Sequence, residues 1–384
     1  MKKLLIIAVA AMAIFAMSVP AMAVSPSTYT FEMAARMLTD IGWNQRSKEV
    51  AGVKNGSEDV GSWFVNMPGH SYLRARFYSV DKNVGGRIEL GLKSLQPEAS
   101  VSLRYAYGYW RVGRCRILAG QTDNWFGSLA YHVRQYVGLN ENAHLLMFGW
   151  GFLWPHRVPQ VQFTYNTDKW GIQFAVEEPR SSSSTYYGAA NTGTDYYYNV
   201  PRLSLTAMFK FGGFMTHPGI SYVNHQYEAG NTGQPDHDWA TWAIVLPIKF
   251  TTGPFTVKFQ GHWGQNFGTE YPFYPSYTRA TLNAAGTDVS DTDIYGGVIA
   301  GEYKIGKIMI TAGFGYENFQ NDQWSTGGGD DTIERWGAFI AVPYQFTKNF
   351  GIHPEFSYYD YDKNPSGTDG GNEWLLGVQF RFVF

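Results

Sequence analysis

Seven basic residues stand at alternate positions in the first third of the chain, next to apolar residues. Stretches such as SYLRARFYSV and GRIELGLK carry them, with an apolar residue at every second position. The seven are Arg36, Arg74, Arg76, Arg87, Lys93, Arg104 and Arg116. A guanidinium group binds carboxylates and phosphates through paired N–H donors. A row of such groups on one surface would therefore attract small anions.

Acidic residues at the same kind of position come later, at Glu302, Glu317 and Glu355, and Glu89 tempers the basic side. If the two groups lie on opposite walls of a narrow aqueous lumen, they set a field across it, because low-dielectric walls focus charge effects. We therefore expect a modest preference for anions such as small carboxylates, without a saturable high-affinity site. The alternative is a solvated lumen whose charges pair across the water and select nothing.

Strands must hold these residues on one face. An apolar residue at every second position predicts strands of about ten residues with one apolar and one polar face. The last of them, WLLGVQFRFVF, keeps apolar residues on one face up to the final Phe384. In a membrane β-barrel the apolar face of each strand points outward to lipid and the polar face points inward to water. A soluble β-sandwich, the alternative, usually has shorter strands that bury their apolar faces against each other.

The links between the strands alternate in length from residue 159 onward. We predict an all-β fold: a transmembrane antiparallel β-barrel of about 16 strands, with short periplasmic turns, long external loops and both ends on the periplasmic side. The final strand must pair with the first, at about residues 28–43, because backbone groups in lipid need partners.

The first residues resemble an export signal. Lys2 and Lys3 precede an apolar run, which is followed by the small residues Ala21 and Ala23. This pattern predicts a signal peptide over 1–23 and a single barrel over 24–384. A retained membrane anchor is the alternative. The formal net charge of −2 gives no indication of a nucleic-acid partner.

Catalytic and metal-binding motifs find little support. The nine His residues are scattered, and no HExxH, Cys/His cluster or Gly-x-Ser-x-Gly motif occurs. Asp288, Asp291 and Asp293 in one loop could hold Ca²⁺, but turn formation explains them equally well. We predict no catalytic residue, cofactor or resident metal, and expect the single Cys115 to pack as a small apolar side chain. The other functions considered are an outer-membrane enzyme and a barrel that anchors or sheathes a partner protein.

Three stretches carry a family resemblance: GRIELGLKS, RYAYGYWRVGRCRILAGQTDNWFGSL and the closing strand. They resemble the trimeric general porins of Gram-negative bacteria, and most of all the DcaP-like homotrimeric porins, although this chain lacks their coiled-coil segment before the first strand. The resemblance implies a water-filled channel in the outer membrane for passive diffusion of small hydrophilic solutes and ions. Phe380, Phe382 and Phe384 look like the signal that the barrel-assembly machinery recognises.

The longest link, 122–158, follows the fifth strand. In general porins the link at this place folds into the barrel and narrows it, so the resemblance implies a constriction loop here, with His132 and Arg134 in it. Its apolar residues, among them Met147, Phe148 and Trp150, favour a packed insertion over contact with bulk water. A loop that caps the outside or the trimer axis is the alternative.

The resemblance also implies a homotrimer, formed through the wall of the first and last strands. We expect Tyr105, Tyr107 and Tyr109 on the outward face of the fourth strand, where they would suit such an interface. Tyrosines of the lipid-facing aromatic girdle are the equally good alternative.

Overall fold

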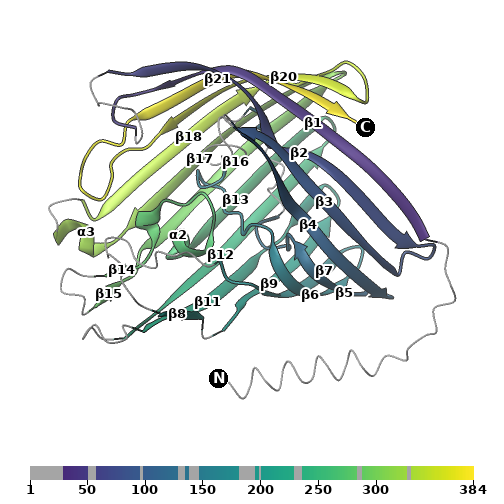
Figure 1. The fold of residues 1–384 in the computed structure, drawn as a ribbon, viewed down its shortest axis with the longest axis horizontal. Helices are drawn as coiled ribbons and strands as arrows, with labels where there is room; N and C mark the ends of the chain where they lie inside the picture. The colour runs from purple at the N-terminus through teal and green to yellow at the C-terminus, as the bar shows by residue number, and fades with distance from the viewer. Residues whose placement is uncertain are drawn as a thin grey trace.

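The protein is a closed antiparallel β-barrel in the computed structural model (Figure 1). The structure describes residues 29–50, 58–95, 98–128, 135–137, 147–180, 195–198, 200–228, 236–282, 288–326 and 330–384. The predicted signal peptide lies outside these residues. Within them, no helix is both long enough and apolar enough to span a membrane.

The wall consists of 16 strands, three of which are interrupted. The uninterrupted strands are β1 (Tyr29–Arg46), β2 (Val60–Ser79), β3 (Val84–Leu95), β4 (Glu98–Val112), β5 (Cys115–Thr122), β6 (Val158–Asn166), β7 (Trp170–Glu177), β12 (His237–Thr252), β13 (Phe255–Gln265), β16 (Asp293–Ile305), β17 (Ile308–Gln320), β20 (Phe350–Asp360) and β21 (Asn372–Val383). The predicted strand number and fold class are confirmed.

Each interrupted strand has a proline at its break, at Pro201, Pro218 and Pro343. Proline has no N–H to donate to the neighbouring strand, so the ladder of hydrogen bonds lapses there. The pieces are β8 (Asp195–Tyr198) with β9 (Arg202–Phe211), β10 (Phe214–Thr216) with β11 (Gly219–Glu228), and β18 (Thr332–Ala341) with β19 (Tyr344–Gln345). Both pieces of each pair bond to the same neighbouring strand, so each pair forms one wall position.

Alternation along the strands separates the two faces as predicted. On β12, Ile244 is 43% exposed and faces outward, whereas its neighbours Ala243 and Val245 are buried inside the barrel. The outward face is apolar all around the wall and the inward face carries most of the polar side chains. This is the arrangement that a membrane barrel requires, with lipid outside and water or packed side chains within.

The barrel closes through β1 and β21, which pair from Arg36 opposite Val383 to Arg46 opposite Glu373. Ala35 and Phe384 exchange both of their backbone hydrogen bonds at the end of this seam, at 3.2 and 2.9 Å. The side chains of Phe382 and Phe384 are exposed on the outer face. The closing strand is therefore held up to its last residue, and its role in assembly stays a prediction.

The fourth strand corrects one expectation. The register of β4 against β3 shifts by one residue between the pairs Glu89–Tyr105 and Leu90–Leu103, which makes Arg104 a bulge. A bulge of one residue exchanges the two faces of the strand beyond it. Leu103 faces outward, but Tyr105 is buried inside the barrel against the Arg87 guanidinium. The prediction that Tyr105, Tyr107 and Tyr109 face outward was wrong, because it assumed unbroken alternation.

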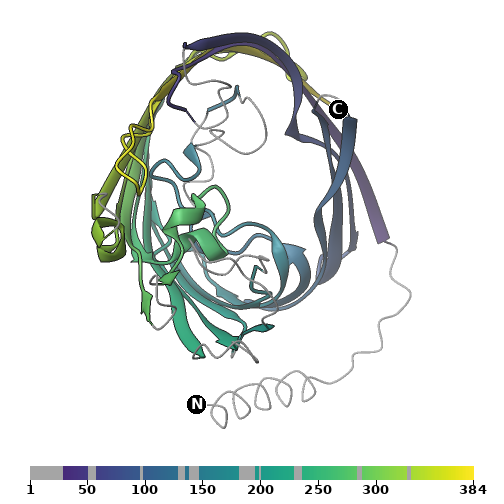
Figure 2. The same cartoon turned by 60° about the vertical axis from the view of Figure 1, so that its left-hand side comes forward.

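The interior is packed on one side. Short helices α2 (Phe267–Glu270) and η4 (Ser276–Thr278) belong to a segment, 266–280, that folds inward (Figure 2). Beyond it come the short hairpin β14 (Thr281–Leu282) with β15 (Val289–Ser290), and α3 (Asp322–Thr326) follows β17.

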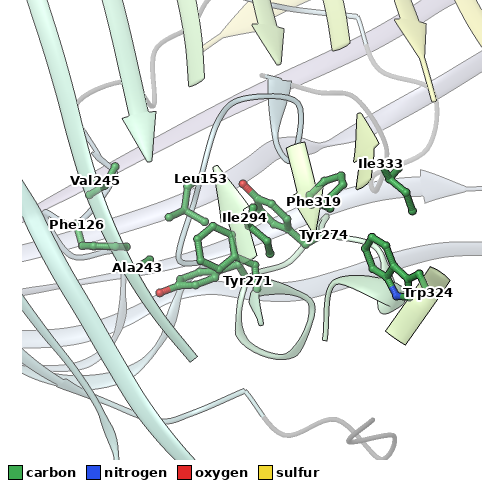
Figure 3. Close-up of a cluster of buried hydrophobic side chains, with 11 residues drawn as sticks. Phe126, Leu153, Ala243, Val245, Tyr271, Tyr274, Ile294, Phe319, Trp324 and Ile333 are labelled. Carbon is green, nitrogen blue, oxygen red and sulfur yellow. The ribbon is translucent and has the colours of Figure 1, made fainter. Parts of the chain in front are cut away.

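Figure 3 shows how this inserted segment is held. Tyr271 and Tyr274 pack with Phe126 and Leu153 of the 122–158 link against inward residues of the wall, and all four are buried. Burial of such rings stabilises by roughly 25 cal/mol per Å² of apolar surface, so the segment has reason to stay inside.

Candidate functional site

The described parts of the link 122–158 are anchored inside the barrel by side chains of the wall. The backbone N–H of Gly151 donates to Glu317 Oε1 at 2.9 Å, and that of Leu153 donates to Gln260 Oε1 at 2.7 Å. The N–H groups of Tyr136 and Val137 both donate to Glu355 Oε2, at 2.5 and 3.2 Å. Because these buried N–H groups would otherwise lack partners, the bonds fix the path of the loop.

Glycines of the wall make room for this loop. Gly315 of β17 stands directly opposite Gly337 of β18, and both are buried and face inward. A Cβ on Gly315 would lie 1.8 Å from the carbonyl oxygen of Trp150, far inside van der Waals contact. Gly151 itself has a φ of +90°, which favours glycine. The backbone of the loop therefore lies directly on the backbone of the wall.

Aromatic rings complete the packing. Phe148, Trp150 and Phe152 are buried with Phe339 and Tyr359 of the wall in one cluster. Phe148 stacks on Phe152 and on Trp154, with ring centroids 5.2 and 4.7 Å apart. The described part of the link is therefore packed inside the barrel, as its apolar residues led us to expect. A constricting effect on solutes stays a prediction.

The three acidic residues predicted to line the pore are buried and do not face an open lumen. Glu317 and Glu355 are buried under the inserted loop, and Glu317 also contacts His262 Nε2 at 2.9 Å and accepts from Tyr274 at 2.8 Å. Glu302 forms an ion pair with Lys258. These carboxylates hold inserted segments or a neighbouring cation, so the acidic wall proposed from the sequence is largely covered.

A cavity of about 650 Å³ remains on the opposite side, between the first strands, the last strand and the inserted loop. We call it the basic cavity. Its charged lining is Arg36, Arg74, Arg87, Arg104 and Arg381 with Glu89 and Asp123. Among the lining residues that the structure describes, cations therefore outnumber carboxylates.

Three of these arginines converge on one carboxylate. Glu89 forms ion pairs with Arg104 Nε at 2.8 Å, with Arg74 Nε at 3.2 Å, and with Arg87. Arg104 Nη1 also donates to the backbone oxygen of Gly69 at 2.5 Å. One negative charge cannot neutralise three positive ones, so this group presents a net positive charge to the cavity.

Aromatic rings support the guanidinium groups from the side. Arg87 lies 3.7 Å from the ring centre of Tyr105, and Arg36 and Arg74 lie 4.7 and 4.4 Å from that of Tyr72. Such contacts orient a cation without neutralising it. His156 in the inserted loop adds no charge at neutral pH, because burial and the adjacent Arg157 lower its pKa to about 4.

The structure thus brings together only part of the predicted set. Four of the seven basic residues line the basic cavity: Arg36, Arg74, Arg87 and Arg104. Arg76 pairs with Glu32, and Arg116 with Thr164, toward the end of the barrel that carries the short turns. Lys93 pairs with Ser100 toward the opposite end, which carries the long loops. His132 and Arg134 lie outside the described residues. That any of these residues conducts solute stays a prediction.

Sequence reasoning missed several lining residues. Arg381 alternates with the outward phenylalanines of the closing strand, so the period of two could have found it. Tyr72 stands two residues before Arg74 and shares its face. Asp123 and Tyr136 come from the inserted loop, where no periodicity indicates which side chains point into the cavity.

No metal site emerges from the part of the chain that the structure describes: no three His, Cys, Asp or Glu side chains gather there to hold an ion. Asp291 and Asp293 accept hydrogen bonds from Asn266 and Gln265 at 2.7 and 2.8 Å. Both carboxylates therefore hold the start of the inserted segment 266–280.

The other end of this segment's helix is held by a buried ion group. Arg202 of β9 contacts Glu177 Oε2 at 2.6 Å and Glu270 Oε2 at 3.4 Å, and all three side chains are fully buried. Replacing Arg202 by Met leaves two buried carboxylates without their cation, which costs about 3–5 kcal/mol. We expect the temperature at which the barrel unfolds in a heat-modifiability gel to fall clearly. Lys363→Gln, which breaks an exposed pair with Asp330, serves as the control and should change it little.

Glu270 makes the stability depend on pH. Burial raises the pKa of its carboxyl from 4.5 to about 7, although Arg202 acts in the opposite direction. The folded state then binds this proton more tightly than the unfolded chain does, so the contribution is complete below pH 4.5 and is lost as the pH rises through 7. The unfolding temperature of Glu270→Gln should therefore decrease less than that of the wild type between pH 5 and 8.5. Equal decreases would contradict this assignment.

This geometry agrees with what comparison with known proteins finds. A family model described as the porin subfamily matches residues 154–376, more than half of the chain. The chain belongs to this porin family. A search of curated protein sequences found no match.

Solved porins share the fold. The outer-membrane channel DcaP of Acinetobacter baumannii superposes with a TM-score of 0.68 at 16% identity, over 94% of this chain and 99% of that chain. The anion-selective porin of Comamonas acidovorans gives 0.60 at 10% identity, over 93% and 100%. The loop L8 deletion mutant of OmpT from Vibrio cholerae gives 0.58 at 14% identity, over 93% and 99%. The protein is thus an outer-membrane porin with a DcaP-like fold, and the strand end with short turns faces the periplasm.

Proposed function

We propose that this porin is a passive diffusion channel with a modest preference for anions, small carboxylates among them. The observation that carries the proposal is the set of five arginines around the basic cavity, with two carboxylates against them. Guanidinium groups held on rings and strands bind carboxylates without reorganising. The porin of Comamonas acidovorans is anion-selective, so the fold accommodates this preference.

A channel fits the interior better than the alternatives. A barrel that sheathes a partner protein needs an open lumen, whereas two inserted segments occupy this one. An enzyme needs a nucleophile or acid–base pair that faces solvent, and the acids with the strongest contacts here are buried against inserted segments. Both functions therefore have less support than diffusion.

Solute entry into liposomes tests the proposal. Proteoliposomes should swell faster in small mono- and dicarboxylates than in organic cations of equal size, because the arginines concentrate anions in the cavity. Raising the salt concentration should shrink the difference by screening. Equal rates for both classes, at low salt, would contradict an anion preference.

The same proposal includes a homotrimer formed through the wall of the first and last strands. Of the wall residues that the structure describes, the two most exposed apolar ones lie there, Met33 at 76% and Trp63 at 75%. A large exposed apolar surface marks either lipid contact or an interface. We expect native mass spectrometry of the detergent-purified protein to give three chains, and Trp63→Lys to lower that mass. A single-chain mass for the wild type would refute the trimer.

A further inference from the structure

The outer wall carries an apolar groove at the periplasmic end, away from the basic cavity. It measures about 410 Å³ and lies across β4, β5, β6, β7 and β9. Most of its lining residues are aliphatic or aromatic, and several of them are exposed on the outward face. We call it the outer groove.

Two rows of paired residues form the outer groove. The upper row runs through register partners Trp110, Ile117, Phe163, Phe174 and Leu205. The lower row runs through Val112, Cys115, Tyr165, Ile172 and Ala207. Large side chains stand in the upper row, whereas the lower row includes the small Cys115 and Ala207. The groove lies just above the short turns that join these strands.

Cations stand at the lower edge of the outer groove. Arg114 lies in the turn between β4 and β5, next to Cys115, and is exposed. A hydrogen bond with Tyr165 and the nearby Asp168 raise the pKa of its guanidinium, so it stays charged. Lys169 lies exposed in the turn between β6 and β7, and Lys210 of the next hairpin donates its backbone N–H to the Lys169 carbonyl at 2.8 Å.

We propose that the outer groove binds one anionic phospholipid, with an acyl chain in the groove and the phosphate beside Arg114 and Lys169. An apolar hollow that opens toward cations at the membrane surface matches the two parts of such a lipid. A zwitterionic lipid carries a positive group as well and gains less from these cations. Asp168 lies near Arg114, but Arg114, Lys169 and Lys210 together outnumber this carboxylate, so an anionic headgroup fits the edge of the hollow better than a neighbouring copy of the chain does.

Cys115 offers a built-in probe, because it is the only cysteine of the chain and lines the groove. The mature protein is reconstituted in phosphatidylcholine, with and without phosphatidylglycerol, and alkylated with the neutral reagent N-ethylmaleimide. Phosphatidylglycerol should slow alkylation severalfold in the wild type. The double variant Arg114→Gln/Lys169→Gln should bind the lipid roughly tenfold more weakly and should therefore lose this protection from alkylation.

The matched control separates a bound lipid from a general surface potential. Lys304→Gln/Lys307→Gln removes the same charge from the end of β16 and the turn that follows it, across the barrel from the groove. It should keep the protection. If phosphatidylglycerol slows alkylation equally in all three proteins, the effect is a surface potential and the proposed site is refuted.

A second readout covers the case in which the double variant does not fold. Native mass spectra of the wild type should show one retained phosphatidylglycerol per chain, and Cys115→Trp, which fills the groove, should lose it while keeping every cation. Loss of the lipid in that variant supports the site, and its retention overturns it. A Cys115 that resists alkylation in every lipid, in a protein with the mass of several chains, shows a chain–chain contact instead and also overturns it.

Discussion

Detaching the inserted loop from the wall is expected to raise the single-channel conductance severalfold. Gly315→Val places side-chain atoms where the Trp150 carbonyl oxygen now lies, since even a Cβ would be 1.8 Å from it. The loop backbone can then no longer lie against the wall at Gly315, and the hydrogen bond from Gly151 to Glu317 is lost. A loop displaced from the wall, or shortened by deletion of residues 126–140, leaves a wider aqueous path. Planar-bilayer recording of purified protein measures the change.

Gly301→Val is the matched control for this experiment. Gly301 lies on the neighbouring strand β16, and a Cβ there would meet only the Phe255 ring, at 4.0 Å. Its conductance should equal that of the wild type. If Gly315→Val folds, as judged by its heat-modifiability, and conducts like the wild type, the inserted loop does not limit the channel.

The second large effect concerns selectivity. Replacing Arg74, Arg87 and Arg104 together by Gln removes three positive charges from the basic cavity. The carboxylate of Glu89 then loses all three of its ion-pair partners. The anion preference should then disappear or reverse. Glu89→Gln should act in the opposite direction and strengthen it, because the same three arginines lose their shared counter-charge. Permeability ratios from salt gradients give both results.

Lys363→Gln controls for a change in net charge alone, since Lys363 pairs with Asp330 on exposed loops outside the cavity. Its permeability ratio should remain that of the wild type. A triple variant that keeps the wild-type ratio would mean that ions do not pass by these arginines, and the basic cavity would then not be the conducting path.

Much of this architecture follows from period-two alternation. Lipid outside and water inside impose that period on every strand, so the strand number, the closure of β1 on β21 and the inward direction of Arg74 and Arg87 could be predicted. The faces of β4 could not. A single extra residue at Arg104 exchanges them, and nothing in the sequence around Arg104 indicates that the ladder slips there.

The inserted segments show a second limit. The stretch 266–280 contains Tyr271, Phe273 and Tyr274 next to Pro272 and Pro275, without the period of a helix or a strand. Its aromatic content indicates that it is buried, as is also true of the stretch around Trp150. The surface against which each segment packs, however, depends on glycines and carboxylates of distant strands. For the same reason Glu317 and Glu355 were expected to face water, whereas they accept hydrogen bonds from the loop that covers them.

The most direct test of the whole account is the reversal potential of the wild-type porin in a KCl gradient across a planar bilayer. Chloride and potassium have similar mobilities in water, so the sign of the potential reports the charge that the channel favours. The arginine-lined cavity predicts a modest anion-selective potential that weakens at high salt, where the charges are screened. A cation-selective potential would contradict the account, because no arrangement of the basic cavity described here would produce it.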